Sequence, residues 1–128
     1  MYALTIKQPW VDLILSGEKR YEFRRWAPRK VCVGDRLALH EAVRGVVAVA
    51  RYGGAYGGGN IVRRMRNGFV QSCPGYPGLE EWLYVNKRPW RSLRLDNVTP
   101  IECVECPGKQ GLWMLPPEIE AAVKEQLA

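Results

Sequence analysis

Charged side chains that could bind an anion are concentrated in one short stretch of the sequence. Gly17, Lys19, Glu22 and Arg24 form a G-x-K-x-x-E-x-R pattern. On a regular strand Glu22 and Arg24 point to the same side, close enough for a salt bridge or a shared ligand. Lys19 has the opposite parity, and joins them only if the chain is still turning out of a preceding helix. One carboxylate with two cations can bind a phosphate, or a base edge and a phosphate. The alternative is a surface ion pair worth well under about 1 kcal/mol.

Tryptophans beside basic residues form a second candidate feature. Trp10, in the Gln8-Pro9-Trp10 segment, is expected to be a core residue of a first helix rather than a stacking platform. Trp26 is the better candidate for stacking an unpaired base, and Trp90 lies in a second basic cluster. Cations hold phosphates while rings hold bases, so both clusters are typical of single-strand binding. Arginines lying over a loop tryptophan are the alternative. The basic residues concerned are Arg24, Arg25 and Arg29 around Trp26, and Lys87, Arg88, Arg91 and Arg94 around Trp90.

Cysteine and histidine give weaker indications of chemistry. Cys103 and Cys106 have C-x-x-C spacing, but a structural zinc site needs four ligands, and Cys32, Cys73 and His40 are not paired at short spacing. The motif ends a strand-like run instead of opening a helix, where a thiol pKa would fall. We therefore expect structural or incidental thiols, a structural histidine and no metal site.

Composition and charge favour a polyanion as partner. The chain has 128 residues and a net charge of +6, with 47% hydrophobic and 25% charged residues, which indicates a single globular domain over residues 1–128. Through Arg94 there are 17 basic and 7 acidic residues, and from Leu95 onward 2 and 6. An excess of basic residues in the first part of the chain is typical of a protein with one positively charged face. No apolar run approaches the roughly 20 residues that span a bilayer, and the start lacks a secretory signal. A cytoplasmic location without membrane contact is expected.

The elements that must position these residues can be read from periodicity and turn residues. A first helix should begin at Pro9 and end before Gly17, and a last amphipathic helix should begin at Pro116. A short basic helix is expected over 60–67, whereas the glycine-rich run from Gly53 to Gly59 predicts no regular element and no phosphate loop. About seven short strands and two or three helices indicate a small β-barrel with helices at its ends. The expected strands are 4–7, 19–26, 36–41, 45–52, 81–87, 98–104 and 110–115.

The order of these segments resembles the ASCH domain, a branch of the PUA-like superfamily. A hydrophobic strand leads into Q-P-W and a helix, followed by the G-x-K-x-x-E-x-R pattern, and later strands match as well. The resemblance is greatest to the branch that includes the ASCH domain of the activating signal cointegrator. The segments that carry it are 4–10, 17–24, 34–40, 45–50 and 108–115.

This resemblance implies an α+β fold, a small PUA-like β-barrel of about six or seven mostly antiparallel strands with two or three short helices. It also implies a cleft beside the signature helix that binds RNA or DNA. Carried over by position, the cleft residues are Gln8, Trp10, Lys19, Glu22 and Arg24. The basic and aromatic residues Arg25 and Trp26 extend the expected nucleic-acid site.

Two activities remain open under the resemblance. The favoured one is a nucleic-acid-binding module without enzymatic activity or cofactor, whose partner is RNA or single-stranded DNA, with RNA preferred. The alternative is a hydrolase acting on RNA or on a modified nucleoside, because some small bacterial members are N4-acetylcytidine amidohydrolases and others are ribonucleases. In the amidohydrolases a threonine stands at the position of Glu22. Here Lys19 would be a base or electrostatic anchor and Glu22 would position a water. A protein partner for the basic face is a third reading.

Overall fold

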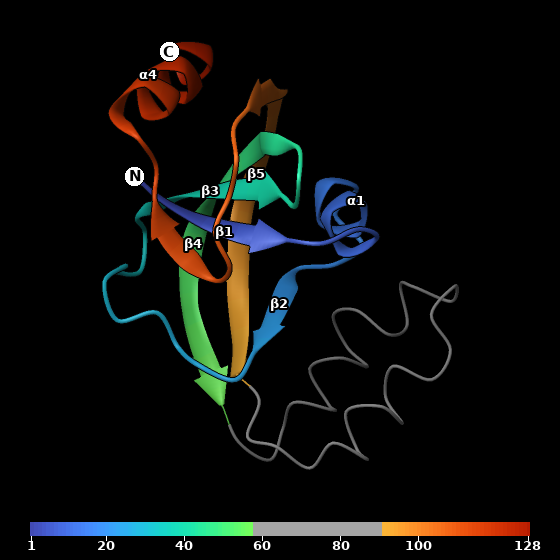
Figure 1. Cartoon of the computed structure of the whole chain (residues 1–128). Coiled ribbons are helices and arrows are strands. Elements are labelled where there is room, and N and C mark those ends of the chain that lie inside the picture. The colour runs from blue at the N-terminus through green and yellow to red at the C-terminus, as the bar shows by residue number, and fades with distance from the viewer. Residues whose placement is uncertain (58–90) are drawn as a thin grey trace.

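The computed structural model describes residues 1–57 and 91–128, and these form one curled sheet with a helix on each side (Figure 1). Within the described residues the sheet has six strands in the order β2-β5-β4-β3-β1-β6. Strand β1 pairs in parallel with β3, and every other neighbouring pair is antiparallel. The expected α+β fold, a small β-barrel of about six or seven mostly antiparallel strands, is confirmed, and the six described strands form a half-barrel. The elements are β1 (Tyr2–Ile6), α1 (Trp10–Leu15), β2 (Tyr21–Arg24), β3 (Arg36–Glu41), β4 (Gly45–Gly57), β5 (Arg91–Glu105), β6 (Leu112–Met114) and α4 (Pro117–Leu127).

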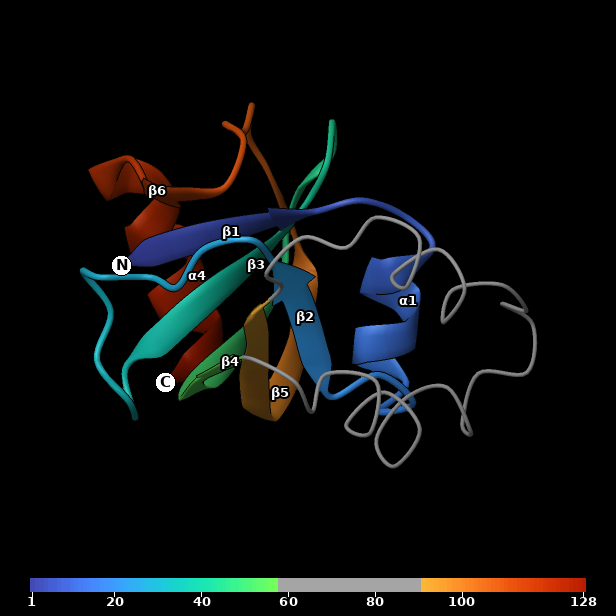
Figure 2. The same cartoon turned by 90° about the horizontal axis from the view of Figure 1, so that it is seen from below.

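Alternation along the central strands divides the core into two hydrophobic clusters. In β3, Leu37 and Leu39 belong to one cluster and Ala38 to the other, as expected for side chains that alternate across a sheet. The first cluster packs against Val11 and Ile14 of α1, and the second against Val123 of α4. The two helices therefore cover opposite faces of the sheet (Figure 2).

Both expected terminal helices are present. Helix α1 begins at Trp10 after a cis Gln8–Pro9 bond and ends at Leu15, with Gly17 at a φ of +83° just past its end. Helix α4 begins with a proline in its first turn, as predicted. No helix among the described residues is long and apolar enough to cross a membrane.

The glycine-rich run is where the sequence-based prediction is wrong. Strand β4 continues through Gly53 to Gly57 and pairs with β5 over this length. The register shifts between Tyr52 and Ala55, and Gly54 has a φ of +102°, which describes a β-bulge that glycine accommodates. A Cβ at Gly53 would lie 2.8 Å from Cγ of Arg94, so a larger residue would disturb the facing strand. These glycines serve close strand pairing rather than a loop.

Two other predicted strands differ in length from the observed ones, and several predictions fall on residues that the structure does not describe. The strand expected over 19–26 is confined to Tyr21–Arg24, and the one over 98–104 is part of the longer β5. The helix expected over 60–67, the strand over 81–87, Cys73, and the Trp90 cluster apart from Arg91 and Arg94 lie outside the described residues.

Candidate functional site

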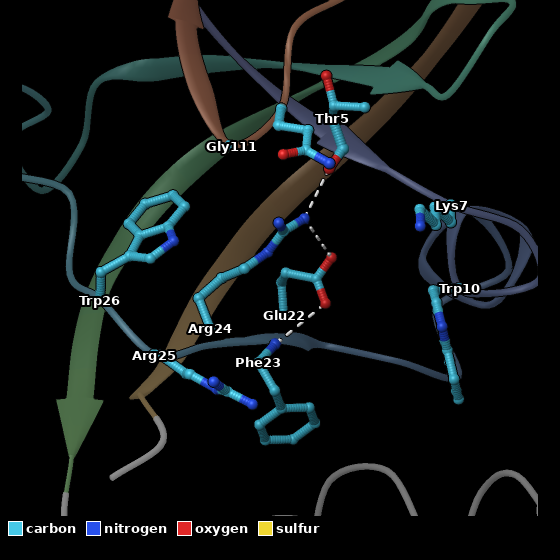
Figure 3. A pocket seen from close by; sticks show the side chains of 10 residues that line it. Thr5, Lys7, Trp10, Glu22, Phe23, Arg24, Arg25, Trp26 and Gly111 are labelled. Carbon is cyan, nitrogen blue, oxygen red and sulfur yellow. Dashed lines mark hydrogen bonds and ion pairs between the residues drawn. The ribbon is translucent and has the colours of Figure 1, made fainter. Parts of the chain in front are cut away.

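A pocket lies between the two edges of the curled sheet. Among the described strands β2 and β6 are the edges, and the half-barrel is open between them. We call this opening the seam. The seam pocket has a volume of about 640 Å³, and its walls come from β1, α1, β2 and the segment before β6 (Figure 3). This volume falls within the range of small-molecule sites in proteins. The lining residues are Thr5, Lys7, Trp10, Glu22, Phe23, Arg24, Arg25, Trp26, Gln110 and Gly111.

Lys19, Glu22 and Arg24 form a connected charge cluster. Lys19 Nζ lies 2.9 Å from Glu22 Oε1, and Arg24 Nη2 lies 3.4 Å from Glu22 Oε2. Lys19 is only 3% exposed and Glu22 6%, so the pair is buried. The interpretation as a weak surface ion pair is therefore wrong. Lys19 and Glu22 are instead removed from solvent, where breaking the pair would leave an uncompensated charge.

The turn after α1 explains why Lys19 reaches the other two residues despite its parity. Gly17 adopts the left-handed conformation, and its N–H donates to the Ile14 carbonyl at 3.1 Å. The Lys19 N–H then donates to the Leu13 carbonyl at 2.9 Å, which folds the chain back under the helix. Lys19 therefore lies before the start of β2, so its side chain does not have to follow the alternation of side chains along the strand.

The carboxyl of Glu22 is held in its ionised form. Burial alone would raise its pKa, but the positive charges of Lys19 and Arg24 lower it. Hydrogen bonds from Lys19 and from the Phe23 N–H at 3.0 Å act in the same direction, and the net result is a pKa below the ordinary value. Glu22 is thus an acceptor and a negative charge at the floor of the pocket.

Arg24 joins the two sides of the seam. Its Nη2 donates to the backbone carbonyl of Thr5 in β1 at 2.6 Å, while the same side chain contacts Glu22 in β2 (Figure 3). Its guanidinium carbon also lies 5.9 Å from the centre of the Trp26 ring. The side chain is 24% exposed, so one part of the guanidinium is fixed while another faces the pocket.

Aromatic rings stand on opposite sides of the pocket. Trp26 and Trp10 lie at opposite sides of it (Figure 3). Trp10 is half-buried against the first hydrophobic cluster, and Lys19 Nζ lies 4.8 Å from its ring centre and 5.5 Å from that of Phe23. Trp10 thus combines the core position that was expected with a surface on the pocket. Trp26 is 36% exposed, so part of this side chain is accessible to a ligand in the pocket.

Gln8 is not brought into this group. Its Nε2 donates to Asp12 Oδ1 at 3.0 Å and to Glu41 Oε1 of β3. Gln8 fixes the start of α1 against the sheet and is not among the residues that line the pocket. Of the expected site residues, the pocket is lined by Trp10, Glu22, Arg24, Arg25 and Trp26, and Lys19 lies beneath it.

The wall residues that the sequence reasoning missed are Thr5, Lys7, Phe23, Gln110 and Gly111. Thr5 is the most consequential of them because it connects the pocket to a buried network. Its hydroxyl donates to the Lys109 carbonyl at 2.6 Å and accepts from Trp113 Nε1 at 2.8 Å. The only feature of the sequence that could have indicated Thr5 was that it is a polar residue within an apolar strand.

His40 is a structural residue, as expected. Its ring is fully buried, with Nε2 3.0 Å from the Cys106 carbonyl and Nδ1 3.3 Å from Thr5 Oγ1. The ring of Trp113 packs edge-on at 5.3 Å between centres. Both ring nitrogens therefore have partners within the fold, and His40 does not reach the pocket.

The three cysteines that the structure describes form no disulfide. Cys32, Cys103 and Cys106 are free thiols, and burial raises the pKa of the Cys106 thiol, which disfavours the reactive thiolate. Within residues 1–57 and 91–128, no three potential metal-binding side chains of His, Cys, Asp or Glu form a group.

Comparison with known proteins identifies the fold family. The sequence model of the ASCH domain matches residues 4–88, which include the whole G-x-K-x-x-E-x-R segment. The chain belongs to the ASCH domain family. The crystal structure of ASCH from Zymomonas mobilis superposes with a TM-score of 0.74 at 16% identity, covering 97% of this chain and 93% of that one. A point mutant of the same protein gives 0.73 at 16% identity, covering 97% and 96%.

These ASCH structures establish a shared fold at an identity too low to carry residue roles. No curated protein matches the sequence.

Proposed function

We propose that this ASCH domain binds single-stranded nucleic acid in the seam pocket, with RNA preferred over DNA. The observation that carries the proposal is that Arg24, Arg25 and the rings of Trp10 and Trp26 line one pocket. Cations beside aromatic rings are the combination that unpaired nucleotides require, because phosphates need charge and bases need stacking surface.

Each group has a distinct role in this proposal. The fork of Arg24, oriented by Thr5 and Glu22, binds a phosphate or a base edge, and Arg25 adds a second cation at the rim. Trp26 stacks on a base. The ionised carboxylate of Glu22 accepts hydrogen bonds from the amino or imino groups of a base, which gives the pocket a preference that charge alone would not provide.

The test is an anisotropy titration of labelled single-stranded RNA, single-stranded DNA and duplex at two salt concentrations. Arg25→Ala should weaken binding of single strands and lower the slope of log affinity against log salt by about 0.7. Trp26→Ala should cost about 1–3 kcal/mol of binding free energy, and Trp26→Phe less, because a smaller ring still stacks.

Lys124→Ala is the matched control, since it removes one positive charge from α4, away from the pocket lining. If Lys124→Ala and Arg25→Ala lower affinity equally, binding depends on net charge and not on the seam pocket. Unchanged affinity in both Arg25→Ala and Trp26→Ala contradicts the site.

Hydrolysis of a modified nucleoside or of RNA is the second candidate. It is favoured by one observation, that the ionised carboxylate of Glu22 lines the pocket and could position a water. Incubation with N4-acetylcytidine and with RNA, followed by chromatography, tests it against Glu22→Gln and Lys19→Met. Product formed equally by all three folded proteins, or by none, eliminates this candidate.

A further inference from the structure

A second pocket adjoins the seam pocket on the other side of Trp26. Its volume is about 580 Å³, and it shares Trp26 and Gly111 with the seam pocket. Its other walls come from the segment after β2 and from β6, so it continues along the same opening of the half-barrel. Its lining residues are Tyr2, Trp26, Ala27, Pro28, Arg29, Lys30, Lys109, Gly111, Leu112, Trp113 and Met114.

The charges of this second pocket are all of one sign. Arg29, Lys30 and Lys109 are exposed and line it, and no aspartate or glutamate does. Among the residues that the structure describes, none of these three cations forms an ion pair with a carboxylate. Their charges are therefore not neutralised locally, and the pocket favours an anionic ligand.

The boundary between the two pockets is formed by Trp26 and Gly111, the two residues that line both. A Cβ added at Gly111 would lie 3.5 Å from Cζ2 of Trp26, so the ring edge packs against the backbone of the segment before β6. Gly111 has a φ of +73°, a left-handed conformation that favours glycine, whereas a Cβ there would make only an ordinary van der Waals contact with the ring. Trp26 thus contacts Gly111 at one edge of its ring, is 36% exposed, and lines both pockets.

A ligand that matches this arrangement has negative charges repeated on both sides of a ring-stacking group. A free nucleotide fills one pocket only, whereas a polynucleotide places a phosphate at each nucleotide. We infer that the ligand is an oligonucleotide that crosses Trp26 and places the adjoining nucleotide in the second pocket. Its phosphate is held there by Lys30 and Lys109. This inference rests on the proposed function of the seam pocket and defines the minimal ligand as a dinucleotide.

The experiment compares uridine 5′-monophosphate with 5′-phosphorylated oligouridylates of two and four residues, so that each added nucleotide adds one phosphate, and each binding is measured by calorimetry. Wild-type protein should bind the dinucleotide about tenfold more tightly than the mononucleotide, as expected for an added charged hydrogen bond. The double variant Lys30→Ala/Lys109→Ala should lose this gain and keep the affinity for the mononucleotide. Both side chains are exposed, so the variant should retain the melting temperature of the wild type.

Two variants separate this inference from the proposed function. Arg25→Ala should weaken the mononucleotide and the oligonucleotides alike, and Lys124→Ala should change neither. Equal affinity of the wild type for one and two nucleotides overturns the inference alone, as does an unchanged gain in Lys30→Ala/Lys109→Ala. Absence of binding by every probe overturns the proposed function and the inference with it.

Discussion

Lys19, Glu22 and Arg24 show how far single residues could be interpreted from the sequence. Strand parity correctly placed Glu22 and Arg24 on the same side, because alternation is a local property of extended backbone. The position of Lys19 depended on a turn whose hydrogen bonds reach back to Leu13, and parity alone could not provide it. Burial of the pair could not be predicted either, because it results from packing against Trp10 and Phe23.

Substitution of Glu22 is predicted to remove a pH-dependent part of the stability. The folded protein holds the pKa of Glu22 below its ordinary value of 4.5. The ionised carboxylate therefore stabilises the fold fully above pH 4.5, and this contribution is lost as the pH falls through the lowered pKa. Glu22→Gln should cost about 3 kcal/mol at neutral pH, because Lys19 remains buried without its counter-ion. Urea unfolding at a series of pH values measures it.

The comparison variant is Glu102→Gln, which changes an exposed carboxyl on β5. The free energies of unfolding of wild type and Glu22→Gln should converge below pH 4.5, while Glu102→Gln stays close to wild type throughout. A difference between wild type and Glu22→Gln that is independent of pH would contradict the assigned ionisation.

At the scale of elements, glycine has two separate uses that the sequence does not distinguish. Gly17 ends α1 in a left-handed conformation with open space around it. Gly108 lies against the buried ring of His40, and a Cβ there would be 2.6 Å from Nδ1. The first use was predicted from helix-ending rules. The second depends on a histidine 68 positions earlier in the chain, so no local pattern could indicate it.

The two uses predict opposite responses to asparagine. Gly108→Ala should destabilise the protein by about 1–3 kcal/mol through overpacking, and Gly108→Asn by more. Gly17→Ala should cost about 1 kcal/mol because of its backbone conformation, and Gly17→Asn should cost less, since asparagine tolerates left-handed backbone. Thermal unfolding of the four variants checks this. The same order of alanine and asparagine at both positions would contradict it.

The glycine-rich run of β4 is another case in which local sequence did not predict the element. Composition indicated a flexible loop, yet Gly53 and Gly54 form a bulge in a paired strand. The deciding factor is the close approach of β5, which follows more than thirty residues later in the sequence. Local propensity could not anticipate it.

At the scale of the whole molecule, the site depends on the opening between the two edge strands of the described sheet, β2 and β6. Its walls come from β2 and from the segment before β6, which lie almost ninety residues apart and form opposite edges of the described sheet. The fold class could be predicted because strand and helix patterns are local. The seam could not be predicted, because the order in which the strands pair decides which strands lie at the edges of the sheet.

Hydrogen exchange should reveal this arrangement. Amides of β3 and β4, which are paired on both sides, should be the most protected, and those of β2 and β6 less so. Addition of a single-stranded oligouridylate should raise protection in β2 and in residues 107–111, and leave β3 and β4 nearly unchanged. Uniform changes across the sheet, or changes confined to α4, would place the ligand elsewhere.

The separation of the seam from the two hydrophobic clusters has an evolutionary consequence. Arg25, Trp26, Arg29 and Lys30 belong to neither cluster of buried core residues. Replacement at these exposed positions changes what the opening can bind while the packing that sustains the fold is preserved. Proteins that inherit this half-barrel can therefore acquire new ligands through substitutions of the exposed residues around the opening. The buried pair of Lys19 and Glu22 beneath it, in contrast, can change only if both partners change together.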